Sequence, residues 1–187
     1  MIFVHQHSIF RDQNNLICLN TYISFMSREH RENISVKTAI IIVSTTRTEK
    51  TDLSGKIIKE CFEKASIPIV SQKIVKDDIS EIRTSVMEAL DVANCIIVSG
   101  GTGLTHDDYT IEAVSPLFVK TIDGFGELFR QKSYAQVGNS VILSRAAAGI
   151  NKGRAIFCIP GSPKAVQLAV EDIIVPEIIH ILTHASQ

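Results

Sequence analysis

The chain lacks an excess of charge, a long apolar run and a secretory leader. Its 19 Lys and Arg nearly balance its 20 Asp and Glu, so bulk charge does not draw it to nucleic acid or anionic lipid. The aliphatic runs are far too short to span a bilayer, and no basic leader precedes a continuous apolar core. We therefore expect a cytoplasmic protein with no nucleic-acid or membrane partner.

The cysteines also lack the spacing of a metal or redox site, because none of the four forms a C-x-x-C pair. Cys95 and Cys158 fall inside apolar runs typical of strands, and Cys61 lies on the apolar side of a segment with helical spacing. Buried free thiols in a reducing cytosol explain these positions better than disulfides or zinc ligation.

The composition predicts one well-buried domain preceded by an extension. With 187 residues, 45% of them hydrophobic, the chain can form a substantial core. Residues 1–33 show no clear period, and we predict a poorly ordered N-terminal extension there, followed by a single α/β domain over 34–187. We hypothesise that residues 1–25 arise from an upstream start codon, which the intact mass of the natively expressed protein would test.

Strand and helix patterns alternate from residue 38 onward. β-branched runs predict strands at 38–44, 69–75, 95–99 and 155–159, with a further short strand at 141–144 outside the main sheet. Apolar residues at helical spacing predict helices at 53–65, 79–93, 110–118, 125–135 and 163–182, the last kinked at Pro176. This order predicts a doubly wound, mostly parallel sheet with helices on both faces.

A glycine-rich turn, Ser99-Gly100-Gly101-Thr102-Gly103, directly follows one of these strands. Consecutive glycines allow a ligand to approach bare backbone, whose N–H groups can face phosphate oxygens. No Lys follows as in a Walker loop, and the glycine spacing also fails the dinucleotide fingerprint. The alternative is a tight strand-to-loop turn that simply needs positive φ.

Polar residues follow the other strands at the edge where ligands bind in open parallel sheets. The segments after the strands are Ser44–Arg47, Lys76–Asp78, Gly100–Gly103 and Pro160–Pro163. Ser162 is expected as the N-cap of the final helix, with Lys164 in its first turn, which makes an anion site.

The candidate metal ligands at this edge are Asp77 and one of the two acids after the glycine turn, Asp107 or Asp108. Each follows a strand end, and Mg²⁺ prefers one or two carboxylates together with substrate phosphate oxygens. For Asp78 the more economical explanation is that it caps the helix beginning at residue 79.

Three motifs together resemble the MoaB/MogA family of molybdenum cofactor biosynthesis, most closely its MoaB branch. They are Gly100-Gly101-Thr102-Gly103-Leu104-Thr105-x-x-Asp108, Gly124-Phe125-Gly126-Glu127 and Pro160-Gly161-Ser162-Pro163, with Ser54-Gly55 and Leu143-Ser144-Arg145 in support. The resemblance covers about residues 37–180.

The resemblance implies a molybdopterin-binding α/β domain that transfers an adenylyl group. In MogA-type members the terminal phosphate of molybdopterin attacks the α-phosphate of Mg·ATP, and pyrophosphate leaves. Asp77 and Asp108 fall on the family's two catalytic, metal-associated acids. The residues expected to bind substrate or nucleotide are Ser44, Ser54, Gly100, Gly101, Thr102, Gly103, Glu127, Ser144, Pro160, Gly161, Ser162 and Lys164.

The family also implies a homotrimer or hexamer and a downstream metal-insertion protein as partner. The sequence departs from the family pattern at Thr46, where relatives often carry an acid or amide. Some MoaB proteins are thought to lack catalysis, but Asp at both 77 and 108 argues for an active member.

Three other functions remain open from the residues. One is a carrier that binds molybdopterin without adenylylating it, another a pyrophosphate hydrolase of the CinA type, and the third a self-assembling scaffold. The sequence indicates no function for the histidines at 5, 7, 106, 180 and 184.

Overall fold

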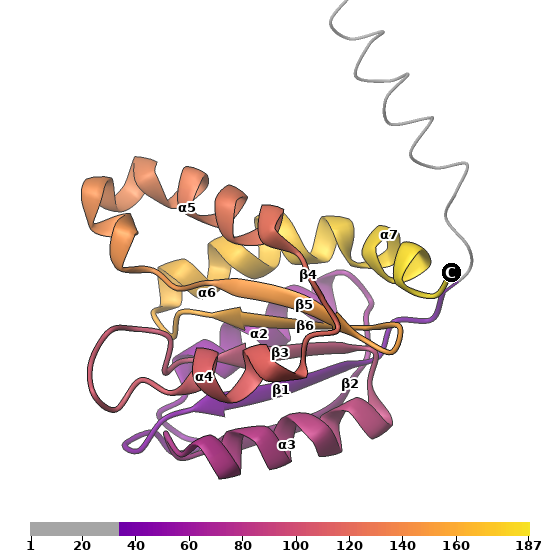
Figure 1. Ribbon diagram of the computed structural model, residues 1–187, viewed down its shortest axis with the longest axis horizontal. Helices are drawn as coiled ribbons and strands as arrows, with labels where there is room; N and C mark the ends of the chain where they lie inside the picture. The colour runs from indigo at the N-terminus through magenta and orange to yellow at the C-terminus, as the bar shows by residue number, and fades with distance from the viewer. Residues whose placement is uncertain (1–33) are drawn as a thin grey trace, which may run out of the picture. The chain divides into compact units, whose positions relative to one another are not determined.

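A computed structural model describes residues 34–187, which alternate strands and helices (Figure 1). The predictions for residues 1–33, including Cys18, lie outside the described residues. In chain order the elements are β1 (Thr38–Val43), α2 (Leu53–Lys64), β2 (Ile69–Val75), α3 (Ile79–Val92), β3 (Cys95–Ser99), α4 (Thr110–Val114), η1 (Ser115–Leu117), β4 (Lys120–Thr121), α5 (Asp123–Val137), η2 (Gly138–Leu143), β5 (Ala147–Asn151), β6 (Arg154–Ile159), α6 (Pro163–Ala169), η3 (Val170–Ile174) and α7 (Val175–Ala185).

The strands form one sheet in the order β2-β1-β3-β6-β5-β4. Strands β2, β1, β3 and β6 are parallel. β5 runs antiparallel to β6, and β4 runs antiparallel to β5. The central strands β1 and β3 are buried along their whole length, as expected for strands covered on both faces. The predicted doubly wound, mostly parallel fold is confirmed.

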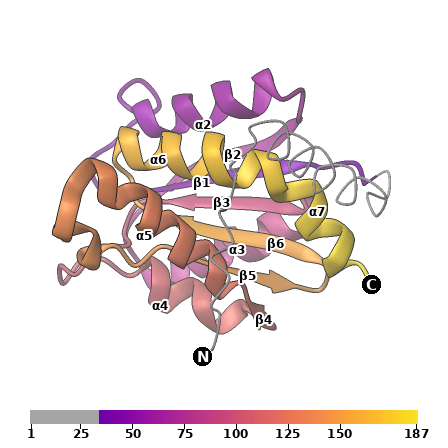
Figure 2. The same ribbon diagram turned by 90° about the horizontal axis from the view of Figure 1, so that it is seen from above.

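Two apolar layers form the core, one on each face of the sheet. Helices α2, α5, α6 and α7 cover one face, and α3 and α4 cover the other (Figures 1 and 2). In the first layer Phe157 of β6 packs edge-on against Phe125 of α5, with ring centroids 5.2 Å apart. Cys61, Cys95 and Cys158 are free thiols buried in these layers, as predicted.

The segment at 141–144 is not a strand, so this prediction is wrong. It belongs to the 3₁₀ turns of η2, in which Ile142 is 77% exposed. The extra strands are instead β4 and β5, which the pattern did not indicate because β5 reads Ala-Ala-Gly-Ile-Asn, with little β-branched character. Lys152 and Gly153, both at positive φ, form the tight turn that joins β5 to β6.

The C-terminal helical segment begins as predicted, with Pro163 at its first position. Ser162 occupies the N-cap position, but its side chain makes no capping hydrogen bond. The segment runs to Ala185 and is interrupted by the wider π turn of η3 just ahead of Pro176, which accommodates a residue without an N–H donor. Neither this segment nor another helix of residues 34–187 has the length and apolar character needed to cross a membrane.

Candidate active site

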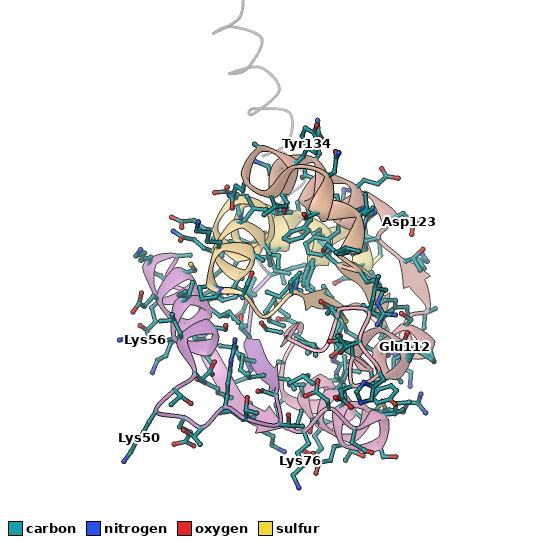
Figure 3. All side chains as sticks on the ribbon, turned by 90° about the vertical axis from the view of Figure 1, so that its left-hand side faces the viewer. Lys50, Lys56, Lys76, Glu112, Asp123 and Tyr134 are labelled. Carbon is teal, nitrogen blue, oxygen red and sulfur yellow. The ribbon has the colours of Figure 1, made fainter. Side chains whose placement is uncertain are left out.

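Four loops meet at the edge of the sheet where β1, β2, β3 and β6 end, and we call them the strand-end loops (44–47, 76–78, 100–108 and 160–163). The amide of Ser44 donates to the Val75 carbonyl at 2.8 Å, and the amide of Gly100 donates to the Ile159 carbonyl at 3.0 Å. A Cβ placed on Gly161 would lie 3.1 Å from the Gly100 Cα. Figure 3 views this edge, with Lys50, Lys76 and Glu112 around its margin.

The glycine turn contacts its neighbours too closely for side chains. Gly100 has a φ of +107°, and a Cβ there would lie 2.3 Å from the Val43 carbonyl oxygen. Gly101 has a φ of +59°, and its Cβ would lie 2.7 Å from Asp77 Oδ1. The hydroxyl of Thr110 donates to the Gly100 carbonyl at 2.7 Å and orders the turn. The positive φ angles and close neighbours are what the alternative, a tight strand-to-loop turn, requires. The approach of a ligand to this backbone stays a prediction.

Asp77 lies against this turn with its carboxylate beside Gly101. Burial and the nearby negative charge of Asp108 raise the pKa of Asp77, although a hydrogen bond from the Thr45 amide acts in the opposite direction. The neighbouring Asp78 caps α3, because its Oδ1 accepts from the Glu81 amide at 2.9 Å. The prediction that Asp78 caps the helix beginning at residue 79 is therefore confirmed.

The raised pKa has a consequence for stability. The folded protein binds the Asp77 proton more readily than the unfolded chain, so this carboxyl costs increasing stability as the pH rises from its ordinary pKa of 3.8 to its raised folded value. Above that value the cost is constant. Asp77→Asn should therefore melt at a higher temperature than the wild type at pH 7, and the gain should shrink as the pH approaches 3.8.

Thermal unfolding followed by circular dichroism from pH 7 downward measures this difference. Asp78→Asn is the control, because it keeps the capping acceptor of α3 and should show no such rise at pH 7. A melting temperature of Asp77→Asn equal to or below that of the wild type at pH 7 would contradict the prediction.

Asp108 is held by its own loop next to Gly103, at the end of the glycine turn. Its Oδ2 accepts from the Thr105 amide at 2.8 Å and from the Thr105 hydroxyl at 2.6 Å. A Cβ on Gly103 would lie 2.6 Å from the same oxygen. Burial acts to raise the pKa of Asp108, but the hydrogen bonds from Thr105 and Gly103 and the charge of Arg145 outweigh it, so the pKa is lowered. Asp108 is thus the more readily ionised of the two acids.

Arg145 joins the glycine turn to the Asp108 loop, which the sequence did not reveal. Its Nε donates to the Thr102 carbonyl at 3.1 Å, and its Nη2 donates to the Asp108 carbonyl at 3.1 Å. The guanidinium also forms an ion pair with Glu112 of α4. The motif Leu143-Ser144-Arg145 supported the family resemblance, but nothing in the linear spacing connects residue 145 with residues 102, 108 and 112.

Arg47 and Ser54 connect the loop after β1 to the loop after β6. Arg47 Nη2 and the Ser54 hydroxyl both donate to the Gly161 carbonyl, at 2.9 and 2.7 Å. Arg47 Nη1 also donates to the Ser54 hydroxyl at 2.8 Å. Because Ser54 is fully buried, this arrangement supports a role in positioning the Gly161 loop. Thr46, the residue that departs from the family pattern, is exposed.

The remaining candidates lie in different surroundings. Ser44 accepts from the Arg47 amide at 3.2 Å and shapes its own loop. The Ser144 hydroxyl is buried without a hydrogen-bond partner among the described residues. Glu127 is exposed on α5, and no hydrogen bond or ion pair within residues 34–187 joins it to the strand-end loops. Lys164 lines a separate depression that also includes Gln136 of α5 and Glu171.

The fold and this site together define a class of protein. A doubly wound sheet with a glycine turn between two carboxylates, at the strand ends, is typical of an α/β domain that binds phosphorylated ligands. The comparisons with known proteins narrow this class, because residues 39–180 match the family described as "Probable molybdopterin binding domain". The chain belongs to the MoaB/MogA family of molybdenum cofactor biosynthesis proteins.

Relatives match over most of their length. The chain is 40% identical to "Molybdenum cofactor biosynthesis protein B" of Bacillus subtilis over 160 residues, covering 83% of this chain and 94% of the relative. The protein of the same name from Bacillus cereus is 44% identical over 161 residues, covering 82% and 94%. The structure of "tungsten cofactor synthesizing protein MoaB" from Pyrococcus furiosus is 39% identical, with a TM-score of 0.76 over 83% of this chain and 100% of that one.

Proposed function

We propose that this chain is a molybdopterin adenylyltransferase of molybdenum or tungsten cofactor biosynthesis. Membership of the MoaB/MogA family and relatives named for these pathways support the pathway. The observation that supports the activity is the placement of Asp77 beside Gly101 and of Asp108 beside Gly103. Two acids beside a glycine turn suit a reaction between two phosphate groups when a divalent cation neutralises part of the negative charge.

The reaction needs charge neutralisation and positioning more than it needs a strong base. The terminal phosphate of molybdopterin, already an anion near neutral pH, forms a new bond to the α-phosphorus of ATP. The bond to the departing pyrophosphate breaks at the same phosphorus, so no proton has to be removed first. Phosphoryl chemistry of this kind depends mainly on electrostatic stabilisation and alignment.

The strand-end loops, and the side chains that hold them in place, have different roles in this proposal. The backbone of the glycine turn would face phosphate oxygens at Gly101 and Gly103, which are only partly buried. Arg145 holds the Thr102 and Asp108 carbonyls at fixed positions relative to each other. Arg47 and Ser54 fix the Gly161 carbonyl, and with it the loop that leads into α6.

The donor set also fits Mg²⁺. The charge of Asp108 raises the pKa of Asp77. These two carboxylates would hold the ion, and a bound divalent cation would relieve their repulsion. When bound, Mg²⁺ supplies positive charge to the phosphate oxygens of ATP. Assembly into trimers or hexamers and contact with a metal-insertion protein remain predictions from the resemblance.

The experiment that tests the activity is transfer of label from α-labelled ATP to freshly prepared molybdopterin, with full-length protein and Mg²⁺. We expect labelled adenylyl-molybdopterin and an equal amount of pyrophosphate. Tight pterin binding without label transfer would contradict the proposal and indicate the carrier function. Release of AMP with no labelled pterin would indicate hydrolysis.

A further inference from the structure

A cavity of about 510 Å³ lies between β4, β5 and the end of α7, away from the strand-end loops. The turn that joins β5 to β6 lines it through Lys152, and β6 begins immediately afterwards. The cavity is therefore at the amino end of the parallel strands, opposite the candidate active site. Ile150 and Ile181 contribute to its apolar wall, and His180 and His184 lie on the same lining.

These two histidines converge at one point. They are one helical turn apart on α7, so their side chains project from the same face. Their Nε2 atoms lie 3.0 Å apart, and their ring centroids are 4.7 Å apart with an interplanar angle of 62°. Two ring nitrogens at this distance either form an N–H···N hydrogen bond or bind the same metal ion.

Glu177 favours the tautomer of His180 that leaves Nε2 available. Its Oε2 lies 3.3 Å from His180 Nδ1. An ionised carboxylate only accepts hydrogen bonds, so the ring proton belongs on Nδ1 and Nε2 keeps its lone pair. A carboxylate that accepts from the second ring nitrogen is the usual outer partner of a metal-ligating histidine.

The separation of the nitrogens matches simultaneous ligation of one metal ion. Imidazole nitrogens bind first-row metals at about 2.0–2.1 Å, and two such ligands at a right angle are about 3.0 Å apart. This angle is the one that tetragonal Cu²⁺ and Ni²⁺ prefer. In the hydrogen-bonded pair, His184 Nε2 carries the proton that it donates to His180 Nε2. When this proton moves to His184 Nδ1, both Nε2 atoms have a free lone pair.

We propose that His180 and His184 form a second ligand site, which binds a divalent transition metal, Cu²⁺ or Ni²⁺, through their Nε2 atoms. No group of three or more His, Cys, Asp or Glu within residues 34–187 is placed to hold a metal, so two ligands come from the protein and the other positions open into the cavity. Lys120 and Lys152 line the same cavity, and their charge favours an anionic group as the further ligand.

The test uses the full-length protein with Cu²⁺ or Ni²⁺ alone. We expect one tightly bound equivalent of Ni²⁺ by calorimetry, in addition to any weaker binding at Asp77 and Asp108. The Cu²⁺ electron paramagnetic resonance spectrum should show hyperfine structure from two nitrogens. His184→Ala should lose that two-nitrogen pattern and bind at least tenfold more weakly. Glu177→Gln should weaken binding about tenfold while leaving both nitrogens in the spectrum.

Two controls separate this site from other donors in the chain. His5→Ala with His7→Ala removes histidines outside the described residues and should leave the affinity and the spectrum unchanged. Asp108→Asn alters the candidate active site and should also leave them unchanged. Unaltered binding by the His180→Ala, His184→Ala double variant would overturn the proposal, as would loss of binding on removal of His5 and His7.

Discussion

Replacing Asp108 with Asn is expected to lower the rate of adenylyl transfer about a hundredfold or more, the usual loss when one electrostatic group of a preorganised site is removed. The Asn side-chain oxygen can still accept from the Thr105 amide and hydroxyl, which now hold Asp108 Oδ2 at 2.8 and 2.6 Å. The loop should therefore keep its shape, and the negative charge beside Gly103 should be the main property lost.

The measurement is the initial rate of label transfer from α-labelled ATP to molybdopterin at saturating Mg²⁺. Asp107→Asn is the matched control, because the Asp107 side chain is 70% exposed and pairs with the exposed His106; its rate should stay within about threefold of the wild type, since exposed pairs contribute little. Equal rates for Asp108→Asn and the wild type would remove Asp108 from the site while leaving the activity established.

Replacing Gly100 with Ala is expected to destabilise the protein by about 3 kcal/mol, from about 1–2 kcal/mol of backbone strain and a further contribution from crowding. The φ of +107° disfavours an L-residue, and the new Cβ would lie 2.3 Å from the Val43 carbonyl oxygen. That oxygen belongs to the backbone at the end of a fully buried strand, so it cannot move aside as a flexible side chain would.

Gly138→Ala is the control that separates strain from crowding. Gly138 has a φ of +58° and a ψ of −142°, a conformation that residues other than glycine rarely adopt, but its Cβ would meet nothing within 4 Å. The variant should therefore lose only the backbone contribution, about 2 kcal/mol. Urea unfolding at pH 7 gives both values. Equal losses for the two variants would show that contact with Val43 contributes nothing to the requirement for glycine at position 100.

The pattern of the sequence determined the parallel part of the fold. The central parallel strands β1 and β3 are buried along their whole length, so the local β-branched runs 38–43 and 95–99 are sufficient to identify them. The same order of elements implied that the segments after β1, β2, β3 and β6 meet at one edge. Asp77, Asp108 and the glycine turn came together there because the carboxyl ends of parallel strands share an edge.

Only the tertiary structure decided the features that depend on partners distant in the chain. β5 pairs with β6 although its sequence is rich in small residues. One of them, Gly149, is needed because a Cβ there would lie 2.3 Å from the Phe118 ring. Arg145 reaches Thr102, 43 residues away. The contact of His180 with His184 and Glu177 likewise needed side-chain positions, because spacing along a helix places residues on one face without setting the distance between their atoms.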